Sequence, residues 1–224
     1  MTWYFSIADG TDGFSPPSIA PAVTERAATR TFRYFFDLLK QLEVIRPVNP
    51  TPFVVPHVGT FERLALAETF IDYRKHRIDE ADFHEKVYFT LTWTAEPDLE
   101  VTRDMPPEIA KARDSLWEHN LRFREVESRD SRGADSVAVR RAVFTVPQRI
   151  VTDVTIRPNH DAGTLDLYTR NLVRLGVDDF RVPAEEADEA VFEELGRALL
   201  GERSTFGRYR TVLERAPARR ARPV

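Results

Sequence analysis

Hydrophobic and polar residues alternate with a period of two in the middle of the chain. From Phe83 to Trp93 every second residue falls on one side, and most of these residues are apolar. His84, Lys86, Tyr88 and several threonines occupy the positions between them. Because successive side chains of a strand point to opposite faces, this segment is predicted to be a strand. A shorter alternation from Thr2 to Ala8 predicts a first strand, with Trp3, Phe5 and Ile7 on one side.

A longer period, of three to four residues, predicts three helices. Between Pro21 and Pro47 one apolar stripe is formed by Ala28, Phe32, Phe35, Leu38, Leu39 and Leu42. Pro106 and Pro107 open a second helix, whose apolar face is Ile109, Ala112, Leu116 and Trp117. A third helix is predicted over 184–200 and is acidic at its start, where the helix dipole favours Glu185, Glu186, Asp188 and Glu189. Gly201 stands at its expected C-terminal cap.

The remaining patterned segments predict strands and turns. Short strands are expected at Phe53–Val55, Arg122–Glu127, Val137–Val146, Arg149–Ile156 and Thr164–Leu172. The last two flank a turn over 157–163, which is typical of an antiparallel hairpin. Residues 61–75 fit either a helix, by their Ala, Leu and Glu content, or a strand, by their neighbours. Residues 129–135 are a predicted polar loop.

This order of elements is not the steady strand–helix alternation of a doubly wound sheet. It predicts an α+β fold, with a mixed or mainly antiparallel sheet covered by about three helices and a C-terminal hairpin followed by the acidic helix. We expect one domain over 1–214, with a possible subdomain boundary near 95–106, and a basic, disordered tail over 215–224.

Composition narrows the classes of protein. The 224 residues include no cysteine, which excludes disulfides, thiolate catalysis and every cysteine-ligated zinc or iron–sulfur site. No apolar run approaches the roughly 20 residues of a transmembrane helix. The first residues lack the positive segment of a secretory signal. These features predict a soluble, cytoplasmic protein that does not bind a membrane.

Charge is distributed unevenly along the chain. Residues 203–224 hold seven arginines and one glutamate, a net charge of +6, whereas residues 1–202 hold 25 basic and 35 acidic residues, a net charge of −10. The tail residues Arg215, Arg219, Arg220 and Arg222 are therefore candidate contacts to phosphates or to an acidic protein partner. The acidic body makes nucleic-acid binding the less favoured of these two interpretations. The alternative to both is a tail that takes no part in binding.

Two polar clusters are candidate metal centres. His76, Asp79 and His84 carry the imidazole and carboxylate ligands that suit zinc, manganese or iron, but their spacing matches no established metal motif. The alternative is a charged turn that leads into the strand at Phe83, with His84 facing solvent.

The second cluster surrounds the predicted hairpin and consists of Asp153, His160, Asp161 and Asp166. Asp153 and Asp166 are expected to face each other across the paired strands, and such carboxylates suit a divalent cation for phosphodiester cleavage. The alternative is ordinary turn chemistry, since Asn, Asp and Gly tolerate tight backbone geometry.

No motif names a reaction. The chain contains no phosphate-binding glycine loop and no Gly-x-Ser-x-Gly nucleophile segment. The sequence therefore favours a non-catalytic protein-interaction subunit or adaptor of an intracellular bacterial assembly, which needs no cofactor. A metal-dependent hydrolase of the phosphodiesterase or nuclease type, which would use a divalent metal, and a nucleic-acid-binding protein are the two alternatives.

Overall fold

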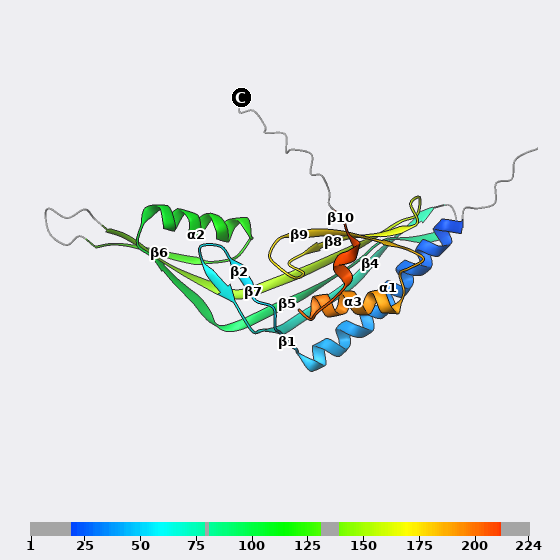
Figure 1. The fold of residues 1–224 in the computed structure, drawn as a ribbon, viewed down its shortest axis with the longest axis horizontal. Helices are drawn as coiled ribbons and strands as arrows, with labels where there is room; N and C mark the ends of the chain where they lie inside the picture. The colour runs from blue at the N-terminus through cyan, green and yellow to red at the C-terminus, as the bar shows by residue number, and fades with distance from the viewer. Residues whose placement is uncertain (1–18, 79–80, 131–138, 212–224) are drawn as a thin grey trace, which may run out of the picture.

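The computed structural model describes residues 19–78, 81–130 and 139–211 (Figure 1). Its α helices are α1 (Ile19–Ile45), α2 (Pro106–Glu118) and α3 (Glu189–Leu199), and a short 3₁₀ helix, η1, spans Phe206–Tyr209. Its strands are β1 (Val48–Asn49), β2 (Phe53–Val55), β3 (Gly59–Phe61), β4 (Leu64–Ile78), β5 (Ala81–Arg103), β6 (Arg124–Asp130), β7 (Val139–Asn159), β8 (Thr164–Arg170), β9 (Val177–Pro183) and β10 (Arg210–Thr211).

One antiparallel sheet dominates these residues. Its strands are hydrogen-bonded in the order β1-β4-β5-β7-β8-β9-β10, with β6 paired to the first half of β7, while β2 and β3 form a separate small hairpin. The two longest strands are β5, with 23 residues, and β7, with 21, and they span the sheet along the strand direction. The predicted α+β class, with an antiparallel sheet and three helices, is confirmed.

Strand pairing determines the secondary structure of the segments whose sequence patterns were ambiguous. The ambiguous residues 61–75 contribute to β3 and β4, because β4 pairs with β5 along its length and this pairing overrides the helical propensity of Ala, Leu and Glu. The two strands predicted over 137–156 are one continuous strand, β7. Strand β9 was not predicted, since charged residues interrupt its short apolar alternation.

One face of the sheet is covered by helices. Alternate residues of β7 on this inner face, from Ala142 to Ile156, are buried, except Gln148. Helices α1 and α3 lie at one end of the sheet and α2 at the other (Figure 1). Beneath α1, the ring of Phe35 stacks on that of Phe89 at 4.8 Å and meets Phe192 of α3 edge-on at 6.0 Å. Burial of each such aromatic side chain contributes roughly 1.5–3 kcal/mol to stability.

Helix α3 begins at Glu189, five residues later than predicted. Asp188 caps it by accepting a hydrogen bond from the Val191 N–H at 3.1 Å. Beyond the helix, Gly201 has a positive φ of 71°, and a Cβ built there would lie 2.1 Å from Asn49 Oδ1. Glycine is needed at this position for both reasons.

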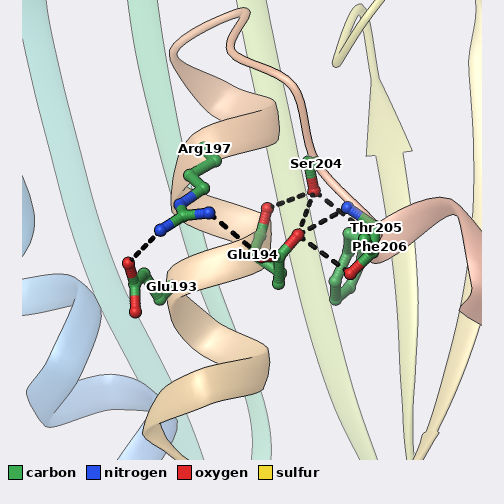
Figure 2. A network of polar contacts seen from close by, with 6 residues as sticks. All are labelled: Glu193, Glu194, Arg197, Ser204, Thr205 and Phe206. Carbon is green, nitrogen blue, oxygen red and sulfur yellow. Dashed lines mark hydrogen bonds and ion pairs between the residues drawn. The ribbon is translucent and has the colours of Figure 1, made fainter.

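A polar network fastens the segment after α3 back onto that helix (Figure 2). Glu194 accepts hydrogen bonds from the hydroxyl groups of Ser204, at 3.2 Å, and Thr205, at 3.0 Å. On the other side of the helix, Arg197 pairs with Glu193 at 2.6 Å. These contacts place Phe206 against Phe180 of β9, with ring centroids 5.0 Å apart.

Three predictions lie wholly or mostly outside the described residues: the strand over 2–8, the polar loop over 129–135 and the disordered basic tail over 215–224. The single-domain assignment also stays a prediction. None of the described helices has the length and apolar character needed to cross a membrane.

Candidate functional site

His84 lies in the interior, contrary to the expectation that it faces solvent. Its side chain is only 4% exposed, and its ring Nδ1 contacts the carboxylate of Glu25 on α1. The same carboxylate accepts a hydrogen bond from the His84 backbone N–H at 2.9 Å. The prediction failed because a register irregularity interrupts the alternation: Arg74 pairs with Lys86, but Lys75 pairs with His84. His84 therefore lies beneath α1 and contacts a helix residue 59 positions earlier in the chain.

The first predicted metal cluster is not assembled around His84. His76 is exposed and pairs with Phe83 across β4 and β5, their rings 6.4 Å apart. Phe83 in turn meets His160 edge-on at 5.4 Å, so that His76 and His160 approach the same aromatic ring. Neither ring nitrogen of His160 has a hydrogen-bond partner among the described residues. Asp79 lies outside these residues.

The second predicted cluster is separated by the register of the β7–β8 hairpin. Asp153 stands opposite Arg170, and Asp166 stands opposite Arg157. The expectation that the two aspartates face each other is therefore wrong. The turn that joins Asn159 to Thr164 fixes the register, and in this register the residue opposite Asp153 lies four positions after Asp166. Asp161 is exposed within that turn.

The two aspartates have opposite electrostatic environments. Burial raises the pKa of Asp153, and Arg170, whose Nε lies 3.8 Å from its carboxylate, only partly opposes this effect. Burial would also raise the pKa of Asp166, but hydrogen bonds from Arg181, Asn159 and Thr164 outweigh burial and lower it. The Arg181 Nε lies 2.8 Å from Asp166 Oδ1.

No group of three His, Asp or Glu side chains with metal-binding geometry occurs in the described part of the chain. The metal-dependent hydrolase thus stays a prediction, to which the arrangement of these residues adds no support. The tail arginines, Arg215, Arg219, Arg220 and Arg222, fall outside the described residues, so the nucleic-acid alternative stays a prediction as well.

The structure instead presents a broad surface that sequence patterns did not assemble. The outer face of the sheet, opposite the helix-covered inner face, is defined by three rows of side chains that follow the strand register. Every member is exposed or half-buried. The rows are Phe70, Thr90, Asp153, Arg170 and Val177; Asp72, Tyr88, Thr155, Tyr168 and Asp179; and Arg157, Asp166 and Arg181.

Aromatic and charged side chains are interleaved on the outer face. Phe70 is 50% exposed and Tyr168 is 43% exposed, and the Phe70 ring lies 5.9 Å from that of Tyr88. A hollow of about 530 Å³ is lined by Tyr168 together with Arg157, Asp179 and Arg181. The signal that locates this surface is cross-strand register, which joins residues from five strands and is not visible in any one segment.

Arginines also gather at two other places. A hollow of about 270 Å³ is lined by Arg122, Arg149 and Arg170 together with Asp153. It lies along β7, between the residues that pair with β6 and those that pair with β8. On α1, the exposed residues Arg26, Arg30 and Arg33 line another hollow, with Glu25 and Glu185. Carboxylates accompany the arginines in both hollows.

The described part of the chain therefore defines an α+β protein whose antiparallel sheet has one helix-covered face and one open face. No known protein family, curated protein or solved structure matches the chain.

Proposed function

We propose that the protein is a non-catalytic interaction subunit, an adaptor of an intracellular bacterial assembly, and that it binds a protein partner through the outer face of its sheet. The observation that carries this proposal is the exposure of Phe70 and Tyr168 on a sheet face that no described helix covers. Large aromatic side chains supply contact area at low entropic cost and are enriched at protein interfaces.

The charges of the outer face favour a protein over a nucleic acid. Asp72, Asp153, Asp166 and Asp179 are interspersed with the arginines of the same surface. A continuous phosphate backbone laid across this face would meet carboxylates in every row, whereas a protein surface with both signs of charge pairs with it. Tyr168 lies near the middle of the face and is its expected energetic centre.

The test is purification of the tagged, full-length protein from its native host under mild conditions, with co-purifying protein, nucleic acid and metal quantified together. Tyr168→Ser and Thr155→Arg change the middle row of the outer face without touching the buried core. Val44→Ser is the matched control, because Val44 is 85% exposed on α1 and lies outside this face.

The proposal expects a stoichiometric protein partner that both outer-face variants lose, by tenfold or more, and that Val44→Ser retains. A solitary protein with stoichiometric metal would overturn it in favour of the hydrolase. Co-purifying nucleic acid that is released by salt would overturn it in favour of the third alternative.

A further inference from the structure

Strand β4 has a long free edge. One side of it is bonded to β5 throughout, but the other side pairs with β1 only at Leu64 and Ala65, and Leu66 donates to the Pro47 carbonyl at 2.9 Å. From Ala67 to Ile78, no hydrogen bond between two backbone groups is made on this side within the described residues. A row of open N–H and C=O groups of this length is a template for another strand.

The middle of this edge is regular. Register irregularities lie between Leu66 and Glu68 and between Arg74 and Lys75, which leaves Glu68–Arg74 as an uninterrupted segment with Ile71 at its centre. The Tyr73 N–H donates to the Asp72 carboxylate at 2.8 Å, which places it on the side of β4 away from β5. Alternate residues of an antiparallel strand direct their backbone groups to the same side. The backbone N–H and C=O groups of Thr69 and Ile71 therefore also point away from β5, toward the free edge.

The charges of this segment are self-complementary. Glu68 stands three residues before Ile71 and Arg74 three residues after it, and both side chains are exposed, with no ion pair inside the described chain. If two copies pair antiparallel about Ile71, Glu68 of each copy faces Arg74 of the other. Opposite charges directly across an antiparallel pair stabilise it, and here the pair occurs twice.

Apolar surface lies along the same edge. Tyr73 is 42% exposed, and its ring packs edge-on against Phe32 of α1 at 4.7 Å. The same pairing sets Thr69 opposite Tyr73 and brings the two Ile71 side chains together on the inner side. In this pairing the Tyr73 N–H donates to the backbone of the second copy and no longer to the Asp72 carboxylate. Asp72 therefore caps this N–H only in the monomer.

We infer that β4 pairs antiparallel with β4 of a second copy of the chain, about a twofold axis at Ile71, and that the sheet continues across the two copies. The occupant is a second copy because both charge pairs close between identical segments, as an isologous interface requires. This inference does not rest on the proposed function, since the variants below lie outside the middle row that tests the outer face.

Charge reversal tests the inferred register. The oligomeric state of the full chain is measured by sedimentation equilibrium over the micromolar range. Glu68→Arg and Arg74→Glu each set like charges opposite one another at both ends of the paired segment, and each is expected to weaken the dimer about tenfold. The double variant Glu68→Arg/Arg74→Glu restores opposite charges and is expected to recover wild-type dimerisation.

A cysteine cross-link tests the axis itself, in a chain with no other cysteine. Directly opposed residues of a hydrogen-bonded antiparallel pair have Cα atoms about 5.5 Å apart, which a disulfide spans. Ile71→Cys is therefore expected to form a covalent dimer under mild oxidation. Val173→Cys, at an exposed position in the loop between β8 and β9 and on the other side of the sheet from β4, is the control and is expected to stay monomeric on denaturing gels.

A wild-type chain that is monomeric over this range would overturn the inference, as would cross-linking of Ile71→Cys no faster than that of Val173→Cys. Release of a different protein by Glu68→Arg, without a change in self-association, would assign the edge to a partner strand and would equally overturn the dimer. Loss of the outer-face partner in Tyr168→Ser while the dimer persists would show that the two surfaces act separately.

Discussion

At the scale of single residues, two aspartates of one hairpin show how little residue type determines. Asp153 and Asp166 are both about one-third exposed, at 35% and 34% of their side-chain surface. Asp166 lies within reach of Arg181, Asn159 and Thr164, whereas Asp153 has Arg170 at a longer distance. Hydrogen bonds to the charged form lower a carboxyl pKa and burial raises it, so the two pKa shifts have opposite signs.

Substitution of each aspartate by asparagine is expected to change the free energy of unfolding in opposite directions. Asp166 has a pKa below its unfolded value, so it contributes stability that is present above that unfolded value, near 3.9, and is lost as pH falls through its folded pKa. Because Asp166 is partly exposed and screened, Asp166→Asn is expected to cost about 0.5–1 kcal/mol at neutral pH. Urea unfolding at a series of pH values measures this cost, which is expected to disappear in acid.

Asp153→Asn is the matched comparison for this prediction. The pKa of Asp153 is raised, so its ionised form disfavours the folded state above the folded pKa, and this penalty is lost as pH falls below it. Asp153→Asn is therefore expected to raise stability by about 0.5 kcal/mol at neutral pH and to have no effect in acid. Equal losses in both variants at neutral pH would contradict this account.

At the scale of elements, helix α1 meets β5 at a partly buried polar contact between Glu25 and His84. Glu25 accepts from both the backbone N–H and the ring of His84, beside a core formed mainly by apolar side chains. Apolar periodicity predicted the helix and the strand separately, since each needs only its own residues. Their contact was not predictable, because it depends on where α1 crosses the sheet.

Glu25→Ala is expected to destabilise the protein by about 1–2 kcal/mol, because it leaves the buried donors of His84 without an acceptor. The neighbouring exposed Arg26→Ala is the control and is expected to stay within about 0.5 kcal/mol of wild type. Chemical denaturation measures both values. If His84→Ala instead loses bound metal with unchanged stability, the contact is not structural and the metal-centre hypothesis regains support.

At the scale of the whole molecule, two strands connect the half of the sheet beneath α1 with the half beneath α2. Strands β5 and β7 pair from Val87 with Ile156 to Arg103 with Ala142, and this pairing passes through the predicted boundary region at 95–106. The register irregularity between Ala95 and Leu99 bends this ladder without ending it. Continuous pairing favours cooperative folding of the two halves.

One unfolding transition is therefore expected. Leu39→Ala empties a buried site beneath α1, and Leu116→Ala empties one beneath α2, each at a cost of about 2–5 kcal/mol. Both variants are expected to shift the same single transition in calorimetry and in far-UV circular dichroism. Two transitions, with each variant moving only one of them, would instead place a domain boundary near 95–106.

The sequence by itself determined the α+β class, the three helices, the hairpin between β7 and β8 and the strand character of residues 83–93. Those features follow from periodicity and turn chemistry, which act over neighbouring residues. Tertiary structure alone decided that residues 64–78 pair as an edge strand, that His84 meets Glu25, that Asp153 and Asp166 are separated, and that Tyr168 and Phe70 share an open face. The reason is that strand register and helix placement bring together residues from distant segments, and a pattern within one segment carries no information about its partner.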